Sequence, residues 1–289
     1  MPIIEPAIRP PAEAESFLLQ ITCGCSSNYC TFCGAYLDKP FRPKAISEIL
    51  ADIKQGTIDY PETRKVFLMD GDALVLSNSK LIPVLDQLNH SFGKLTRISS
   101  YANGYNIISR NKNELKELFN LKLNLIYIGL ESGNQQILDQ CNKQSTVEQM
   151  IKAVKNAADV GIKSSVIVLI GLGGKKYAKQ HVEDTIVVLN KMQPRFLSFL
   201  SLMLIPGTAL YKAEKQGEFQ QLNARELLAQ TYDILYGLEL EKTIFRTNHA
   251  SNYLPLEGRF PQDKQYLLEI LKQALAGKIN LRSEMFRGL

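Results

Sequence analysis

Short apolar segments alternate with segments of helical periodicity over most of the chain. The apolar segments are nearly continuous and rich in β-branched and aromatic residues, which favours buried strands. Six such strands are predicted, at residues 17–22, 65–69, 96–101, 125–129, 164–170 and 196–203. Helices are predicted between them at residues 46–55, 77–89, 113–119, 147–160 and 182–191.

The clearest of these helices covers residues 147–160. Apolar residues recur there at intervals of three and four positions, so that one face of the helix can be buried. Ser145 and Thr146 stand before it and Gly161 stands after it. These residue types favour the start and the end of a helix.

Repeated strand–helix units predict a parallel sheet with helices on its outer face, because parallel neighbours need long crossover connections. Six units are fewer than the eight of a TIM barrel. We therefore expect an α/β fold, a partial (β/α)6 TIM-like barrel with a mainly helical C-terminal extension. The expected domains are an N-terminal arm (1–16), the barrel (17–220) and the extension packed on the barrel (221–289). Helices at 222–240 and 263–275 are predicted in the extension, with a polar loop at 247–260 between them.

Composition and charge restrict the expected compartment of the protein, but they do not identify its partner. Hydrophobic residues make up 45% of the 289 residues, enough for a sizeable core, yet no apolar run approaches the roughly 20 residues of a membrane span. The N-terminal sequence lacks the charged start and apolar core of a signal peptide, so a cytoplasmic protein with no membrane partner is expected. The net charge of +5 comes without a dense basic block with interleaved aromatic residues, which disfavours nucleic acid as the partner.

Three of the five cysteines lie within nine residues, as Cys25-x4-Cys30-x2-Cys33. A closed zinc site usually takes four ligands, and no fourth residue is equally convincing here. Cys141 is more than a hundred residues away, and Cys23 alternates with Cys25 at a strand end, where their side chains start on opposite faces. The spacing favours a [4Fe–4S] cluster with one iron open to another ligand, while zinc, and Cys23 as first ligand, stay as alternatives.

The segment 24–36, GCSSNYCTFCGAY, resembles the signature of the radical S-adenosylmethionine (SAM) superfamily. The usual spacing in that family is Cx3Cx2C with an aromatic residue before the last cysteine, and Phe32 stands at that position. The longer first gap resembles an Elp3/HemN-like subset with a Cx4Cx2C motif. The resemblance implies that Cys25, Cys30 and Cys33 are the metal ligands of the cluster.

The resemblance also implies which later residues contact SAM. In a parallel barrel, functional residues collect where strands give way to loops. Beside Phe32, the cofactor-binding residues implied at strand ends and after the fourth unit are Asp70, Gly71, Asp72, Ser100, Asn103, Glu131, Lys143 and Gly171. Ordinary structural interpretations stay open, because glycine, asparagine and aspartate are common in turns and lysine is common on solvated surfaces. No catalytic residue is assigned.

The expected activity follows from this resemblance. One electron from the cluster would cleave SAM reductively into methionine and a 5′-deoxyadenosyl radical, which abstracts hydrogen from an unidentified substrate. We expect a small-molecule or modified substrate, a reaction of oxidoreductase or lyase type, and an electron donor such as flavodoxin or ferredoxin. The alternative is a non-catalytic Fe–S or zinc protein in electron transfer or assembly, which would need a fourth protein ligand.

Two further features have less specific interpretations. The polar segment 246–260 is expected either to close the open side of the barrel and touch substrate or SAM, or to be a surface connection. His181 stands alone after the fifth strand and is expected to be structural. Pro206, Gly207 and Thr208 resemble HemN-like proteins and favour the start of a helix.

Overall fold

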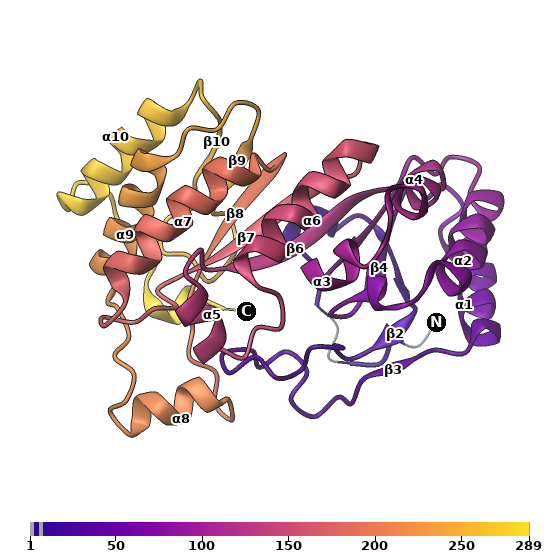
Figure 1. Cartoon of the computed structure of the whole chain (residues 1–289), viewed down its shortest axis with the longest axis horizontal. Helices are drawn as coiled ribbons and strands as arrows, with labels where there is room; N and C mark the ends of the chain where they lie inside the picture. Colours follow the sequence, from indigo (N-terminus) through magenta and orange to yellow (C-terminus); the bar gives the residue numbers. More distant parts are fainter. Residues whose placement is uncertain (1–2, 6–7, 289) are drawn as a thin grey trace. The chain divides into compact units, whose positions relative to one another are not determined.

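The computed structural model describes residues 3–5 and 8–288. Within them the chain forms two compact units, whose helices and strands are labelled in Figure 1. The first unit contains the described residues up to Tyr29 together with Cys33–Ile128 and Lys152–Ser164. The second unit contains Cys30–Phe32, Gly129–Ile151 and the residues from Ser165 onward.

Four parallel strands form the sheet of the first unit. Their order is β1 (Phe17–Gln20), β4 (Lys65–Met69), β5 (Arg97–Tyr101) and β6 (Leu123–Glu131). The last three residues of β6 belong to the second unit. Strand β4 is buried from its second residue onward, as its continuous apolar sequence predicts for a strand covered on both faces. A separate antiparallel pair joins β2 (Thr22–Cys23) to β3 (Arg42–Pro43).

Helices provide the crossovers between these parallel strands. Helix α1 (Ile46–Asp59) precedes β4, α2 (Asn78–Ser91) precedes β5, and α4 (Lys112–Asn120) precedes β6. Helices α1 and α2 lie side by side, and α2 also packs on α4 (Figure 1). The shorter helices of this unit are η1 (Pro11–Glu13), η2 (Ala73–Val75) and α3 (Gly104–Ile108).

The second unit contains parallel strands and one antiparallel strand, and Lys163 and Ser164 at the start of one of these parallel strands belong to the first unit. Strands β7 (Lys163–Ile170), β8 (Phe196–Ser201) and β9 (Ile244–Arg246) are parallel neighbours, and β10 (Glu257–Arg259) pairs antiparallel with β9. Helix α9 packs against both α7 and α10 (Figure 1). The helices here are α5 (Gln135–Gln140), α7 (Ala178–Met192), α8 (Ala209–Lys215), α9 (Ala224–Gly237), α10 (Lys264–Leu275) and η3 (Glu284–Phe286). Helix α6 (Val147–Val160) has residues in both units.

The expected fold class is confirmed, because the fold is mixed α/β with a mainly parallel eight-stranded sheet, consistent with a partial TIM-like barrel. Helix α6 has the predicted bounds, and Thr208 caps α8 by accepting the N–H of Tyr211 at 3.2 Å. No helix in the described part of the chain combines the length and apolar composition that crossing a membrane requires.

Some element boundaries differ from the prediction. One strand over residues 17–22 is wrong, because the chain leaves β1 before Ile21 and pairs Thr22 with the separate strand β3. Strands β9 and β10 are absent from the prediction, and β10 falls inside the expected loop at 247–260. Three residues are too few for the alternation of apolar and polar positions to reveal a strand.

A buried carboxylate ties the segment before β1 to the sheet of the first unit. Glu13 is fully buried, and both of its oxygens accept from Nη2 of Arg97 at 2.8 Å. The Tyr127 hydroxyl donates to Oε1 at 2.6 Å, and the Ser16 hydroxyl donates to Oε2 at 2.5 Å. A charge buried so completely is tolerated because donors surround it.

Replacing Glu13 by alanine is expected to lower the free energy of unfolding by about 3 kcal/mol, because Arg97 and Tyr127 lose the acceptor they share. Urea denaturation followed by circular dichroism measures this change. Glu15 is exposed, so Glu15→Ala is the matched control and should stay within about 0.5 kcal/mol of the unmodified chain. If both variants lose the same free energy of unfolding, the buried hydrogen bonds of Glu13 do not contribute to stability as proposed.

His181 lies inside α7 and is fully buried. Its Nδ1 is 2.9 Å from the Ser132 hydroxyl, and its Nε2 has no hydrogen-bond partner among the described residues. Burial lowers the pKa of His181 from 6.5 to about 4, so the ring is neutral near pH 7. This environment agrees with a structural histidine.

Because the folded chain holds His181 neutral, the unfolded chain binds more protons between about pH 4 and pH 6.5. The contribution of this residue to the free energy of unfolding is therefore complete above pH 6.5. It should fall by about 1.4 kcal/mol per pH unit as the pH drops towards 4. Urea denaturation at a series of pH values should show a shallower slope for His181→Asn. His90→Asn, at an exposed site, should keep the original slope, and a His181→Asn slope equal to it would refute the assignment.

Candidate functional site

The start of the cysteine segment is bonded to the residues that follow β4. The N–H of Gly24 donates to Oδ2 of Asp70 at 2.7 Å, and the N–H of Gly71 donates to the carbonyl of Gly24 at 3.2 Å. Gly24 has φ +74°, and a Cβ there would lie 2.6 Å from the carbonyl oxygen of Lys39. Glycine is thus required for the chain to pass so close to that carbonyl.

Asp70 is buried and acts as a junction inside the first unit. Its Oδ2 accepts from Gln20 at 3.1 Å and lies 2.8 Å from Nζ of Lys39. Burial raises the pKa of Asp70, and the Lys39 ammonium opposes this rise. Its Oδ1 has no hydrogen-bond partner among the described residues. With φ +68°, this non-glycine residue also holds strained backbone directly after a strand, a feature that concentrates at functional sites.

Asp72 and Asn103 hold the next two residues of the cysteine segment. Asp72 is buried, accepts from the Ser26 hydroxyl at 3.0 Å and also accepts from the side-chain amide of Asn106. Burial raises the pKa of Asp72, and the Asn106 hydrogen bond opposes the rise. The side-chain amide of Asn103 donates to the Ser27 hydroxyl at 2.8 Å. The structure therefore brings these two predicted residues together around one loop, with Asn106 as a partner that the sequence did not indicate.

Exposure separates the five cysteines into two groups. The predicted ligands Cys25, Cys30 and Cys33 are half-buried, whereas Cys23 and Cys141 are 2% and 4% exposed. Burial raises the pKa of Cys141 to about 11, so its thiol is protonated near pH 7. Since metals bind the thiolate form, Cys141 has the chemistry of a core residue. Cys23 is grouped with it by burial alone.

The three predicted ligands are divided between the units, with Cys25 and Cys33 in the first and Cys30 in the second. Within residues 3–5 and 8–288, no three histidine, cysteine, aspartate or glutamate side chains are grouped as a metal site. Binding of one cluster by Cys25, Cys30 and Cys33 together therefore stays a prediction.

Tyr36 provides a test of fit for a group bound beside Cys25 and Cys33. Its side chain is buried, and its hydroxyl has no hydrogen-bond partner among the described residues. Burial first, then the charges of Asp70, Tyr101 and the two cysteines, raise the pKa of Tyr36. A buried donor without an acceptor calls for a missing partner such as a water or a bound ion. The residues present thus fit a bound group that accepts a hydrogen bond at this place.

In the second unit, Glu131 and Lys143 form an ion pair of 3.0 Å, with each side chain 13% exposed. Glu131 is the last residue of β6 and has φ +64°. A Cβ on Gly129 would lie 2.0 Å from Oε1 of Glu131, so glycine leaves the room that this carboxylate occupies. The structure therefore brings these two predicted residues together.

Three other predicted residues have structural partners. Phe32 packs against a hydrophobic cluster of the second unit that includes Cys141. The Ser100 hydroxyl donates to the carbonyl of Tyr101 at 2.8 Å. Gly171 has φ +91° and donates its N–H to Oε1 of Gln230 at 3.0 Å. Their predicted contacts with SAM stay predictions.

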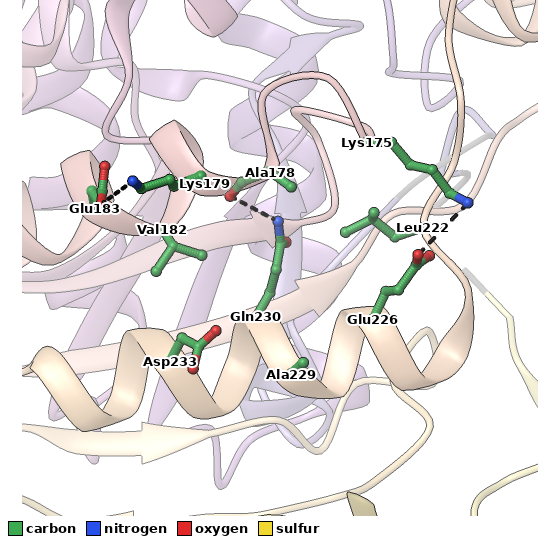
Figure 2. A pocket seen from close by; sticks show the side chains of 10 residues that line it. All are labelled: Lys175, Ala178, Lys179, Val182, Glu183, Leu222, Glu226, Ala229, Gln230 and Asp233. Atoms are coloured by element: carbon green, nitrogen blue, oxygen red, sulfur yellow. Dashed lines mark hydrogen bonds and ion pairs between the residues drawn. The ribbon is translucent and has the colours of Figure 1, made fainter.

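A hollow of about 490 Å³ lies along α7 and α9 in the second unit. Figure 2 shows the side chains that line it. Four of its charged side chains form ion pairs, Lys175 with Glu226 and Lys179 with Glu183, each at 3.6 Å, and Asp233 also lines it. Gln230 on its wall donates to the carbonyl of Ala178 and accepts the N–H of Gly171. The predicted site residues do not line this hollow.

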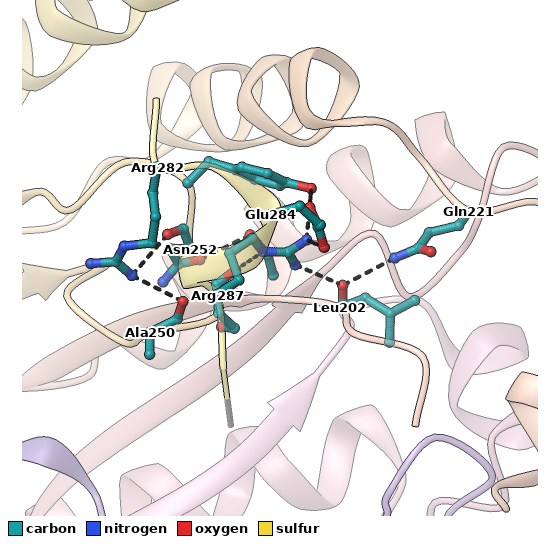
Figure 3. A network of polar contacts seen from close by, with 10 residues as sticks. Leu202, Gln221, Ala250, Asn252, Arg282, Glu284 and Arg287 are labelled. Carbon is teal, nitrogen blue, oxygen red and sulfur yellow. Dashed lines mark hydrogen bonds and ion pairs between the residues drawn. The ribbon is translucent and has the colours of Figure 1, made fainter. Parts of the chain in front are cut away.

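The polar segment 246–260 is fixed to strand β8 by buried contacts. The Asn252 side chain donates to the carbonyl of Phe199 at 2.7 Å. Figure 3 shows Arg287, near the C-terminus, bonded to the segment and to Leu202. Its Nε donates to the carbonyl of Ser251 at 2.7 Å, and its Nη2 donates to that of Leu202 at 3.2 Å. Part of this segment is therefore firmly anchored near the carboxyl end of β8.

The fold is mainly parallel α/β, and polar residues that follow its strands hold a thiol-rich loop, at the place where functional residues of parallel barrels collect. The family model of the radical SAM superfamily matches residues 19–188, and the chain belongs to this superfamily. Binding of a [4Fe–4S] cluster and SAM is a general property of that family.

Comparisons with individual proteins agree with this family. The chain is 26% identical over 148 residues to the tRNA uridine(34) acetyltransferase of Methanocaldococcus jannaschii, covering 49% of this chain and 26% of that relative. Coproporphyrinogen III oxidase (HemN) of Escherichia coli is similar with a TM-score of 0.56 and 16% identity, covering 76% of this chain and 50% of HemN. The Elp3 of Methanocaldococcus infernus is similar with a TM-score of 0.54 and 15% identity. The match covers 92% of this chain and 64% of the Elp3 chain in that structure.

At these identities the two solved structures show a shared fold alone. The chain spans about a quarter of the acetyltransferase and half of HemN.

Proposed function

We propose that this chain holds a [4Fe–4S] cluster through Cys25, Cys30 and Cys33 and uses SAM to abstract hydrogen from its substrate. The observation that carries the proposal is the difference in exposure between these half-buried thiols and the buried Cys23 and Cys141, in a chain of the radical SAM superfamily. A cluster with three protein ligands leaves one iron for SAM.

When bound, the cluster and SAM supply a one-electron cleavage that gives methionine and a 5′-deoxyadenosyl radical. The chain's own residues orient these groups. Asp70 and Asp72 hold the cysteine segment through Gly24 and Ser26, which keeps Cys25 in place. The unpartnered Oδ1 of Asp70 is a suitable acceptor for an ammonium group, in keeping with the role expected from the resemblance.

Glu131 and Lys143 are assigned to the polar groups of SAM. Each side chain keeps 13% of its surface exposed although the two form an ion pair. The carboxylate is a suitable acceptor for ribose hydroxyls, and the ammonium is a suitable partner for the SAM carboxylate. Asn103 and Gly171, whose polar groups already bond within the protein, are assigned to positioning.

We also propose that the reaction is of oxidoreductase or lyase type and that the substrate is a small or modified molecule. The electron would come from a donor such as flavodoxin or ferredoxin. The similarity to a tRNA uridine(34) acetyltransferase makes uridine nucleosides one class to include in a substrate screen.

Anaerobic reconstitution with iron and sulfide tests this function. The chain should bind about four iron and four sulfide and absorb in the thiolate-to-iron charge-transfer region. With SAM and dithionite it should form 5′-deoxyadenosine, measured by liquid chromatography. Cys33→Ala is the control and should give only background product. A cluster whose EPR signal ignores SAM, with no 5′-deoxyadenosine formed, would refute the proposal in favour of an electron-transfer protein.

A further inference from the structure

Tyr36, three residues after the last cysteine of the motif, is a buried side chain with an unused donor. It is 4% exposed, and its hydroxyl has no hydrogen-bond partner among the described residues. Leaving such a group unpaired costs free energy of folding, because the hydroxyl loses its hydrogen bonds to water. At position 36 tyrosine is therefore less favourable for stability than phenylalanine, unless a bound group accepts the hydrogen bond of its hydroxyl.

The surroundings of Tyr36 determine what that group is. A tyrosine hydroxyl ordinarily keeps its proton near pH 7, so this buried group can donate one hydrogen bond. Among the groups that act on it are Cys25 and Cys33, both of which are half-buried. Asp70 also acts on it, but its Oδ2 is already engaged by Gly24, Gln20 and Lys39, and its Oδ1, which does not bond to Tyr36 either, is assigned to the ammonium group of SAM. The centre of its ring lies 5.5 Å from Nζ of Lys39, which is 2.8 Å from the Asp70 carboxylate that holds Gly24, the residue before Cys25. The unused donor therefore lies in the surroundings of the cysteine segment.

We propose that the Tyr36 hydroxyl donates a hydrogen bond to a sulfur of the cluster on the side held by Cys25 and Cys33, and thereby raises the reduction potential of the cluster. This inference rests on the proposed function. Hydrogen bonds to cluster sulfurs are among the factors that set the potential, because they stabilise the more negative reduced state. Tyr36 is then a positioning and tuning residue, since it touches the cofactor and not the substrate.

Tyr29 provides a matched control within the same segment. It lies between Cys25 and Cys30, but its side chain is 71% exposed. Both Tyr36→Phe and Tyr29→Phe remove only one hydroxyl, so they differ in burial and surroundings and not in chemistry.

The test is a redox titration of the reconstituted variants, with the reduced cluster quantified by EPR at fixed potentials. For Tyr36→Phe the ratio of reduced to oxidised cluster at a fixed potential is expected to fall about tenfold, a one-electron shift of about 59 mV to lower potential. Tyr29→Phe should match the unmodified chain. ENDOR in D₂O should show an exchangeable deuteron coupled to the cluster that Tyr36→Phe lacks.

The outcomes separate this inference from the function on which it rests. An unchanged ratio in Tyr36→Phe at equal iron content would overturn the inference while the cluster itself is retained. Failure of the unmodified chain to bind iron would overturn the proposed function instead. If Tyr36→Phe fails to fold, 3-fluorotyrosine at position 36 keeps the hydroxyl as a stronger donor. The ratio should then rise, and an unchanged ratio would overturn the inference.

Discussion

Cys25→Ala should lose the cluster and reduce 5′-deoxyadenosine formation by about a hundredfold or more, while Cys23→Ala should retain both. Cys25 is half-buried and follows Gly24, which is bonded to Asp70. Cys23 lies in β2, where it is 2% exposed and pairs with Arg42. Removing a ligand leaves the cluster with two thiolates, whereas removing a core thiol changes only local packing.

Iron content after anaerobic reconstitution and product formation from SAM measure this difference. Both variants carry alanine, so their side chains have equal size and neither can bind metal. Thermal melting followed by circular dichroism verifies that each is folded. If Cys23→Ala loses iron and Cys25→Ala keeps it, the first ligand is Cys23 and the Cx4Cx2C assignment is wrong.

Gly71→Ala is expected to reduce bound iron about tenfold although residue 71 has no side chain to bind metal. A Cβ at this position would lie 2.6 Å from Sγ and 2.5 Å from Cβ of Cys25. The cysteine segment cannot simply retreat, because the N–H of Gly71 is bonded to the carbonyl of Gly24 and Asp70 holds the N–H of Gly24. Cys25 must therefore move or change its rotamer, which displaces the proposed ligand.

Gly93→Ala is the matched control, because a Cβ on Gly93 meets nothing within 4 Å. It should keep the iron content and product formation of the unmodified chain. Iron analysis and the EPR signal of the reduced cluster measure the effect in both variants. Full iron binding by a folded Gly71→Ala would contradict the proposed place of Cys25 in the site.

Local patterns were sufficient for most of the fold. Apolar runs located β4, β5 and β7, and helical periodicity located α6 together with its bounds. They were insufficient for β9 and β10, whose three-residue strands exist because they pair with neighbours. Pairing of this kind depends on partners far away in sequence, so it leaves no local signal.

In the candidate site, the sequence indicated some of the residues but not the contacts that they make. Asp72 and Asn103 were recognisable because they follow predicted strands, but their contacts with Ser26 and Ser27 were not. Asn106 was missed, because its contact with Asp72 joins residues 34 positions apart and leaves no local pattern. Tyr36 carried no signal of its role, because nothing local distinguishes a buried tyrosine from an exposed one.

The amino-acid sequence by itself determined the class of fold, the radical SAM resemblance and the three closely spaced thiols. Each of these depends on residue types at short, regular intervals. Only the tertiary structure decided that Cys23 is buried while Cys25 is half-buried, and that Asp70 is held by Gln20 and Lys39. Burial and hydrogen bonding join segments that are distant in sequence, so the order of residues does not reveal them.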